Sequence, residues 1–440
     1  MAYWEDVRVE PDFAAYRARD RVGGRYARYH PDRLMDLGGR TEIDAAAAST
    51  LVDATSAVYA LGQRLRERHL PLLSYTLLRS ESIASSWIEG LRETPRNVMA
   101  AGLEDVGTSS VSASVLRNMT AMTDAVEALR TGAWDHSAVH AVHHALLPRS
   151  AENCYRRDQV FIGGSSPLTA QFVPPPYGEV DGYMDDLLRY ANESADPPVL
   201  KAAILHAQFE TIHPYDDGNG RIGRALFHGV LARAGAVDSG VVPLSMALRE
   251  DKDGYVAALT AFRHGSQSAQ ATVDANSRLV TFLMNAVLDA VGIAQDVIRD
   301  VEGVLERWAP HLARYRVDSS IHRIVALAIE QPVLTAGYVM ERLRVTRPTA
   351  MTNIAELVRA GILQRAGGRF RRQEVFQATD VLRVMEDYLP GVQTVSLPAL
   401  PSTPAGRSYG GPRCGRLLPR KGVPCTLPLG HAGSCRDTAG

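Results

Sequence analysis

Twelve consecutive residues, HPYDDGNGRIGR from His213 to Arg224, combine several groups that are used in phosphate chemistry. Gly218, Asn219 and Gly220 can adopt positive φ values and expose successive backbone N–H groups as a nest for an anion. A helix is expected to begin near the end of this nest, and its N-terminus adds a partial positive charge at the same place. The backbone alone therefore predicts a phosphate-binding site.

The same segment also supplies charged side chains and a base. Arg221 and Arg224 lie three residues apart, on one face of the expected helix, where both can bind phosphate oxygens. The carboxylate of Asp217 is a hard oxygen ligand of the kind that Mg²⁺ accepts beside nucleotide phosphates. His213 is a candidate general base. A plain turn between two core helices would not need these side chains together, so the segment predicts phosphoryl or nucleotidyl transfer.

This segment resembles the Fic family signature, His-Pro-Phe-x-Asp/Glu-Gly-Asn-Gly-Arg-x-x-Arg, with Tyr215 where Phe is usual. The likeness extends upstream, where DQVFIGGSSPLTAQFVPPP over residues 158–176 resembles the family's target-docking hairpin, or flap. The resemblance covers roughly residues 15–290. It implies a protein adenylyltransferase that moves AMP from MgATP onto a Ser, Thr or Tyr hydroxyl of a protein target, including itself.

The resemblance also implies roles for single residues. His213 would deprotonate the target hydroxyl, and Asp217 would hold Mg²⁺ between the α- and β-phosphates. The nest residues Gly218, Asn219 and Gly220 would stabilise charge that develops on the phosphate oxygens. Arg221 would bind the β-phosphate and Arg224 the γ-phosphate. The flap would pair with an extended target segment by β-augmentation, through Val160, Phe161, Ile162 and Gly163.

A second resemblance concerns SSWIEG, which places Ser85, Glu89 and Gly90 at the spacing found in the inhibitory helix of self-inhibited Fic proteins. A carboxylate paired with Arg224 would take the place of the γ-phosphate, so that ATP binds in an unproductive pose. We expect Ser85 to orient that carboxylate. The alternative is an ordinary glutamate on a helix surface, since most glutamates face solvent.

The rest of the chain predicts an all-α body with the flap as its β-hairpin, followed by a winged helix-turn-helix domain. Apolar residues recur at helical spacing, and residues 1–42 have a mixed composition that predicts irregular structure. The expected helices cover 41–70, 73–91, 113–131, 136–147, 179–193, 198–212, 221–235 and 270–312. The expected domains are an N-terminal helical region with the inhibitory helix (1–110), the Fic catalytic domain (111–310), the winged domain (318–390), a flexible linker (391–413) and a candidate zinc-binding tail (414–440).

Residues 318–390 show three helical patterns and a Gly-Gly turn between two short strands, which is typical of a winged helix-turn-helix. Nine arginines against four glutamates over residues 319–376 give a local charge of +5, which suits phosphate contacts. Arg347 and Thr349 open the third helix, where a recognition helix presents its DNA contacts. Winged domains also serve as docking or dimerisation modules, and that alternative stays open.

Three of the four cysteines lie in the last residues of the chain. Three thiolates and one imidazole are a complete tetrahedral set for structural Zn²⁺, and the candidates are Cys414, Cys425, His431 and Cys435. The alternative is a disordered basic tail with incidental cysteines. His136, His140 and His144 also share helical spacing, but their apolar neighbours favour a packing role over a metal site.

The net charge of −1 gives no global signal for nucleic acid or a membrane surface. The N-terminus lacks the pattern of a secretory signal, and no uninterrupted apolar stretch approaches the roughly 20 residues of a membrane span, so we expect a cytoplasmic protein without a membrane partner. A homodimer is a further expectation. Two other functions remain open: a DNA-binding regulator whose Fic domain senses ATP, and a Fic enzyme that transfers another phosphate-containing group.

Overall fold

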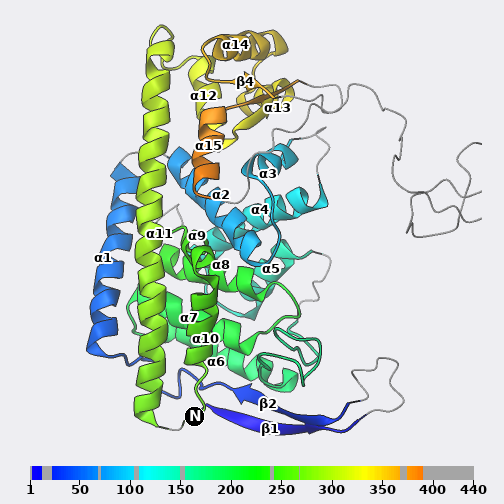
Figure 1. The fold of residues 1–440 in the computed structure, drawn as a ribbon. Helices are drawn as coiled ribbons and strands as arrows, with labels where there is room; N and C mark the ends of the chain where they lie inside the picture. The colour runs from blue at the N-terminus through cyan, green and yellow to red at the C-terminus, as the bar shows by residue number, and fades with distance from the viewer. Residues whose placement is uncertain are drawn as a thin grey trace, which may run out of the picture. The chain divides into compact units, whose positions relative to one another are not determined.

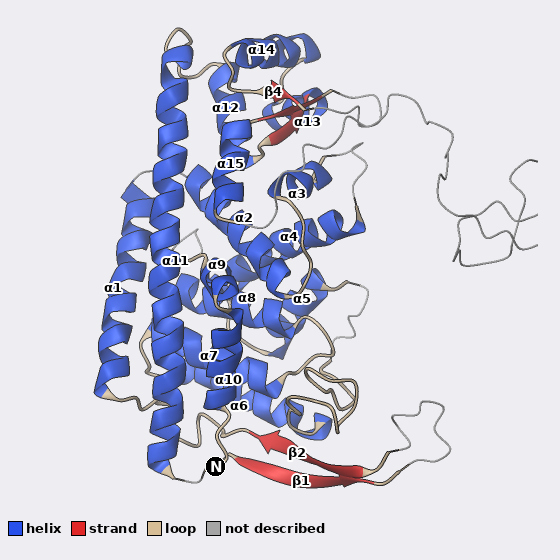
Figure 2. Cartoon of the chain, in the orientation of Figure 1, coloured by secondary structure: helices blue, strands red, loops and turns tan. Residues whose placement is uncertain are grey.

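The computed structural model describes residues 2–11, 22–67, 71–103, 109–148, 154–237, 242–266, 268–366 and 374–389. These ranges are mostly helical (Figures 1 and 2), which confirms the all-α class. The helices before the long α11 are α1 (Ala45–Glu67), α2 (Pro71–Ile88), α3 (Pro95–Ala101), α4 (Ser110–Thr131), α5 (His136–Leu146), the short 3-10 helix η2 (Tyr177–Glu179), α6 (Val180–Glu193), α7 (Pro198–Ile212), α8 (Asn219–Arg233), α9 (Leu244–Glu250) and α10 (Lys252–Phe262).

Helices α7 and α8 form the centre of the body and pack against each other. Every residue of α7 from Ala202 to Ile212 is buried, as expected for a core helix that other elements cover on all sides. Helix α8 packs in addition on α4, α5 and α2. The segment between α7 and α8, residues 213–218, is therefore fixed at both ends by buried helices.

Helix α11 (Ala269–Leu312) is the longest described helix and packs along α1, α9 and α10. Among the described helices, it is the one whose length and composition would allow it to cross a membrane. Its most apolar window is 56% buried inside the protein, as a core helix would be.

The N-terminal residues differ from the prediction of irregular structure. Strands β1 (Tyr3–Val9) and β2 (Gly24–His30) form an antiparallel ribbon, with Tyr3 opposite His30 and Val9 opposite Gly24. Cross-strand ion pairs, such as Arg28 with Glu5 at 2.7 Å, contribute to the pairing. An apolar alternation, the usual signal of a strand, is absent because both faces of this ribbon carry polar residues.

The predicted flap at residues 158–176 is mostly turns rather than a regular hairpin. Its one described antiparallel bridge joins Ile162 to Phe172. Proline cannot donate to a strand ladder, and the three prolines at 174–176 end the pairing on that side. Tyr29 of β2 extends the arrangement, since its N–H donates to the Val173 carbonyl at 3.0 Å.

The last described elements are four helices and three short strands, in which the sheet order is β3–β5–β4 and all pairs are antiparallel. The elements are α12 (Ser320–Glu330), β3 (Val333–Thr335), α13 (Ala336–Leu343), α14 (Arg347–Arg359), β4 (Gln364–Arg365), β5 (Val375–Gln377) and α15 (Thr379–Asp387). The predicted wing turn at Gly367 and Gly368 lies outside the described residues, so the winged helix-turn-helix and the predicted domain boundaries stay predictions.

The C-terminal elements share an apolar cluster with α2, the helix whose end precedes the predicted inhibitory residue Glu89. Ile83, Ala84 and Trp87 of α2 pack in one cluster with residues such as Val333 and Leu382. This packing buries the face of α2 that points away from α8. The described residues belong to one compact unit; the second unit, made of residues 367–369 and 395–440, lies outside them.

Candidate functional site

The loop between α7 and α8 is shaped by two left-handed residues. His213 ends α7 with φ 52°, and Gly218 precedes α8 with φ 86°. The Asn219 side chain holds the loop between them, because its Oδ1 accepts from the Tyr215 N–H at 3.0 Å and its Nδ2 donates to the Tyr215 carbonyl at 2.7 Å. Glycine at 218 is required by the positive φ and by Leu147, whose Cδ1 would lie 2.7 Å from an added Cβ.

Tyr215 is buried and braced by two histidines of α5. Its hydroxyl hydrogen-bonds His140 Nδ1 at 2.7 Å, and its ring stacks on His143 at 3.9 Å between centroids. His136 hydrogen-bonds the Tyr155 hydroxyl at 2.8 Å. Over the described residues no group of three or more His, Cys, Asp or Glu is arranged to hold a metal ion. His136 and His140 thus contact tyrosine hydroxyl groups, whereas His144 is exposed.

His213 has the properties of a neutral base. Burial lowers the pKa of its imidazole to about 4, so that the ring is uncharged at neutral pH. Its Nδ1 lies 3.4 Å from the Glu210 carbonyl oxygen, and a proton on Nδ1 would leave Nε2 free to accept one. The imidazole is thus prepared to accept a proton at the edge of the nest.

Asp217 lies at the mouth of the loop with a side chain that is 73% exposed. One of its oxygens accepts from the Gly218 N–H at 2.6 Å. A cavity of about 300 Å³ adjoins it, lined by residues that include His143, Tyr215 and Arg156. An accessible carboxylate beside a cavity of this size fits the predicted Mg²⁺ ligand.

The two arginines of α8 have different surroundings. Arg221 Nη1 donates to Asn118 Oδ1 at 3.2 Å, while its buried Nε has no hydrogen-bond partner among the described residues. Arg224 is only 1% exposed. Its Nε donates to Ser85 Oγ at 2.9 Å, and its Nη2 donates to the Ser85 carbonyl at 3.0 Å and to Glu89 Oε1 at 2.8 Å.

Ser85 and Glu89, the residues of the predicted inhibitory helix, both contact Arg224. The Glu89 carboxylate lies against the first turn of α8, where a Cβ on Gly220 would be 2.1 Å from Glu89 Oε1. Burial raises the pKa of Glu89, but the charge and hydrogen bond of Arg224 outweigh it and bring that pKa below its ordinary value. The Arg224–Glu89 pair is therefore an ion pair at neutral pH, in the half of the site where a phosphate is expected.

Gly90 has φ 83° and closes α2, because the Leu91 N–H donates to the Ser86 carbonyl at 2.9 Å. The predicted role of Ser85 differs in detail from its contacts. Its hydroxyl binds the Arg224 guanidinium and forms no described bond to the Glu89 carboxylate. Lys252, which the sequence analysis did not single out, donates from Nζ to the Ile88 carbonyl at 2.8 Å and ties the end of α2 to α10.

The flap residues lie beside the catalytic loop through Arg156. Ile162 directs its N–H and carbonyl at Phe172 and Gln171. The backbone groups of Phe161 and Gly163 form no hydrogen bond to described residues, and Gly163 lies in a turn with φ 71°. The Val160 carbonyl accepts from Gln159 Nε2 at 3.4 Å.

The remaining predicted residues lie elsewhere or outside the described chain. Arg347 is exposed at the start of α14, and the Thr349 N–H donates to Oγ1 of the capping residue Thr346 at 3.5 Å. The candidate zinc ligands Cys414, Cys425, His431 and Cys435 lie outside the described residues.

Sequence reasoning missed three residues that contact the loop or its helix: the buried Arg156 and Glu210, and the half-buried Arg263. Burial raises the pKa of Glu210 to about 7 and lowers that of Arg156 and of Arg263 to about 10. Arg156 and Arg263 bond mainly to backbone carbonyls, so no complementary side-chain pattern announces them.

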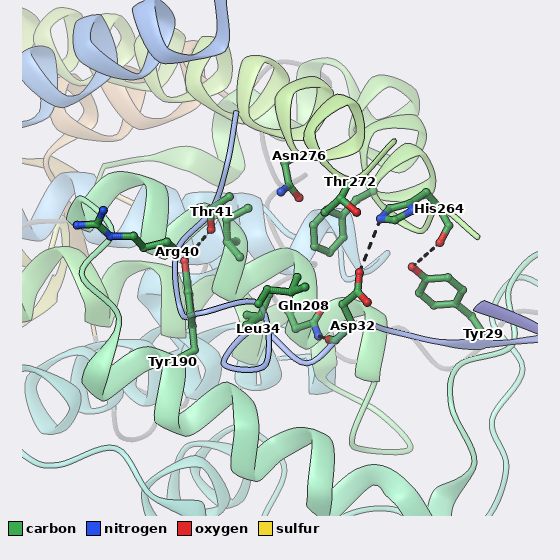
Figure 3. Close-up of a pocket in the computed structure, with 13 residues that line it drawn as sticks. Tyr29, Asp32, Leu34, Arg40, Thr41, Tyr190, Gln208, His264, Thr272 and Asn276 are labelled. Carbon is green, nitrogen blue, oxygen red and sulfur yellow. Dashed lines mark hydrogen bonds and ion pairs between the residues drawn. The ribbon is translucent and has the colours of Figure 1, made fainter. Parts of the chain in front are cut away.

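A second, separate cavity lies where the end of β2 meets α7 and α11 (Figure 3). Its lining includes Asp32, Gln208 and His264, and its volume is about 30 Å³. A space of this size holds about one water molecule, so it is not a nucleotide site.

Of the three predicted nest residues, Gly218 has a positive φ, whereas Asn219 and Gly220 lie in the first turn of α8. The N-terminus of this helix, a neutral imidazole, an accessible carboxylate and two arginines are groups from which a phosphate-binding site can be built. Residues 133–231 match the Fic/DOC family, and this part of the chain is a Fic domain. A stretch of 125 residues is 34% identical to a probable protein adenylyltransferase of Aquifex aeolicus, and it spans 28% of this chain and 34% of that protein.

A shorter stretch of 84 residues is 39% identical to the protein adenylyltransferase Fic of Drosophila ananassae, and it spans 18% of this chain and 16% of the relative. The matches therefore cover about a third or less of these relatives. A Fic family protein of Desulfovibrio desulfuricans with a solved structure is 23% identical, with a TM-score of 0.45 over 75% of this chain and 95% of that one.

Proposed function

We propose that this protein transfers AMP from MgATP to a hydroxyl group of a protein, and that Glu89 inhibits this transfer in the resting state. One observation carries the proposal: the neutral His213 ends α7, the accessible Asp217 precedes α8 by two residues, and the buried Arg224 in α8 is paired with the Glu89 carboxylate. The adenylyltransferase relatives and the Fic domain support the same activity.

In the proposed reaction, His213 accepts the proton of a Ser, Thr or Tyr hydroxyl. The hydroxyl oxygen forms a bond to the α-phosphorus, the bond from that phosphorus to the bridging oxygen breaks, and pyrophosphate leaves. Backbone N–H groups of Gly218 to Gly220 stabilise the charge on the phosphate oxygens. Arg221 and Arg224 bind the β- and γ-phosphates. Asp217 would hold Mg²⁺, which supplies neutralising charge beside the phosphates.

Inhibition follows from the position of Glu89. While its carboxylate pairs with Arg224, the γ-phosphate has no guanidinium to bind, and the triphosphate is held in another pose. The edge of the flap at Val160 to Gly163 would bind an extended target segment by main-chain pairing. Support comes from the Phe161 and Gly163 backbone groups, which use no hydrogen bond to described residues.

ATP labelled at either the α- or the γ-phosphate tests the activity. The full chain and its Glu89→Gly variant would be incubated with each label and Mg²⁺, and then analysed by mass spectrometry for a bound AMP. Protein-bound label from the α position only is the expected result, and the His213→Ala variant should retain none. Label from the γ position would instead indicate phosphorylation. Absence of both labels would favour an ATP sensor that regulates through DNA binding.

Further proposals concern the ends of the chain and its partners. The tail would hold structural Zn²⁺ through Cys414, Cys425, His431 and Cys435, and the third helix of the winged domain would contact DNA through Arg347 and Thr349. Metal analysis of protein purified under reducing conditions tests the tail, because absence of stoichiometric zinc removes the site. A cytoplasmic location, a homodimer and the absence of a membrane partner also remain proposals.

A further inference from the structure

The end of α7 carries the proposed base, and its carbonyl groups need hydrogen-bond donors from outside the helix. The last carbonyls of any α-helix have no partner within the helix. Here α7 ends at Ile212, and His213 follows in a left-handed conformation. Two arginines from other parts of the chain, Arg156 and Arg263, supply donors to this helix end.

Arg156 is only 4% exposed, and its guanidinium binds carbonyl groups of both the loop after α7 and the flap. Toward the catalytic loop, its Nε donates to the His213 carbonyl at 2.9 Å and its Nη2 lies 3.5 Å from the Ile212 carbonyl. Toward the flap, its Nη1 donates to the Asp158 carbonyl at 3.0 Å and its Nη2 to the Pro175 carbonyl at 2.6 Å. One guanidinium therefore joins both ends of the flap to the residue that provides the base.

Arg263 follows α10 and reaches the same helix end from the other direction. Its guanidinium carbon lies 3.7 Å from the centre of the Phe172 ring, in the returning segment of the flap. Its Nε donates to Thr211 Oγ1 at 3.3 Å and its Nη2 to the Glu210 carbonyl at 3.4 Å. Among the described residues, neither Arg156 nor Arg263 has a carboxylate within ion-pair distance. Their charges lie instead at the negative end of α7.

The N-terminal ribbon supports this contact from outside. The Tyr29 N–H donates to the Val173 carbonyl, and its hydroxyl donates to the His264 carbonyl at 3.0 Å (Figure 3). Trp4 meets Phe172 edge-on at 6.2 Å between ring centroids. The ribbon thus covers Phe172 beside the ring face that Arg263 contacts.

We propose that Arg156 and Arg263 are positioning residues, which fix the docking flap at a set distance from His213. The inference rests on the proposed function, because it takes the flap as the surface that presents the target hydroxyl. Transfer requires that hydroxyl to lie near His213 and the α-phosphorus together, and a misplacement of about 1 Å can lower the rate about a hundredfold. Residues 218–220 and the arginines of α8 form no described hydrogen bond with either residue, so we expect phosphate binding to persist without them.

The test uses the full chain with Glu89→Gly as the parent, and compares Arg156→Gln and Arg263→Gln. A matched control is Arg233→Gln, whose guanidinium also binds a carbonyl, that of Gly132 at 3.4 Å, but contacts neither flap nor loop. We expect Arg156→Gln and Arg263→Gln each to transfer α-label at least about tenfold more slowly than the parent, with the same MgATP affinity by calorimetry. Hydrogen exchange at the Ile162 and Phe172 amides should become faster, while amides of α8 stay protected.

Transfer at the parental rate in both variants would overturn the proposal. So would a loss of MgATP affinity equal to the loss of transfer, because the arginines would then support the phosphate site or the whole body. A second variant, Phe172→Leu, keeps both arginines and removes only the stacked ring. It therefore tests the contact between Arg263 and the flap even where an arginine variant fails to fold. It should slow transfer and make hydrogen exchange in the flap faster. If the parent transfers no label, the proposed function fails. The hydrogen-exchange measurement still decides whether Arg156 and Arg263 hold the flap in place.

Discussion

Glu89→Gly should raise the rate of AMP transfer by about ten- to a hundredfold. The Arg224 guanidinium is 1% exposed and donates to Glu89 Oε1 at 2.8 Å, so the bond is charge-assisted and largely shielded from water. Such bonds contribute about 1.5–3 kcal/mol, and each 1.36 kcal/mol corresponds to about tenfold in rate. Because the Glu89 side chain is 34% exposed, solvent weakens the pair, and the lower half of this range is expected.

The same change should also lower the stability of the ATP-free protein. Removal of Glu89 leaves the Arg224 charge buried without its carboxylate, and the loss should fall below the roughly 3–5 kcal/mol typical of fully buried pairs. MgATP offers Arg224 a new anionic partner. The rise in melting temperature on adding MgATP should therefore be larger for Glu89→Gly than for the unmodified chain.

The assay is the initial rate of α-label incorporation, with a thermal melt on the same samples. Glu89→Gln is the matched control for charge, since it keeps the shape of the side chain and removes only the ion pair. Ser85→Ala should have a smaller effect in the same direction, because Ser85 Oγ accepts one bond from Arg224. Arg224→Ala should stay inactive in combination with Glu89→Gly. Unchanged rate and unchanged ATP affinity in Glu89→Gly would refute the inhibitory role.

Three further predictions test other parts of the site. His213→Ala should abolish transfer and leave ATP affinity intact in calorimetry, because the imidazole is not part of the nest; transfer at the original rate would exclude it as the base. Gly220→Ala should destabilise the original chain by about 1–3 kcal/mol but the Glu89→Gly chain much less, since the new Cβ would lie 2.1 Å from Glu89 Oε1. Denaturant unfolding of the original chain, the two single variants and the double variant measures this coupling. Equal losses of stability in both backgrounds would contradict the contact. Burial raises the pKa of Glu210 from 4.5 to about 7, so the folded chain binds its proton more tightly than the unfolded chain, and stability should fall as the pH rises between those values. Urea unfolding across this pH range should show that slope in the original chain and lose it in Glu210→Gln.

The loop between α7 and α8 could be predicted because its candidate functional side chains lie close together in the sequence. His213, Asp217 and Arg224 lie within twelve residues, and the glycines between them have a direct backbone meaning. The contact of Glu89 with Arg224 spans 135 positions and could be predicted only from a resemblance and from charge complementarity. The predicted helix at 270–312 also followed from apolar periodicity, and it matches α11 (Ala269–Leu312).

What the sequence could not predict depends on backbone partners and on polar strands. Arg156 contacts carbonyl groups, which every residue has, so no residue type marks its partners. The β1–β2 ribbon carries cross-strand ion pairs such as that of Arg25 with Asp6 rather than an apolar face, and period-2 hydrophobicity is therefore missing. The flap has a turn signal and β-branched residues, but its prolines limit it to one bridge at Ile162.

The burial of Arg224 gives a physical reason why the Glu89 carboxylate could inhibit the proposed AMP transfer. A guanidinium buried in the middle of the body needs an anion, because an unpaired buried charge costs several kcal/mol. Two anions can reach it from the nest side: the Glu89 carboxylate, which lies at the first turn of α8 in the resting protein, and a phosphate of the nucleotide. Each binds the same donor and neutralises the same charge, so each excludes the other. In the proposed mechanism, Glu89 would therefore stabilise the folded chain while ATP is absent, and by the same contact it would oppose the productive pose when ATP binds.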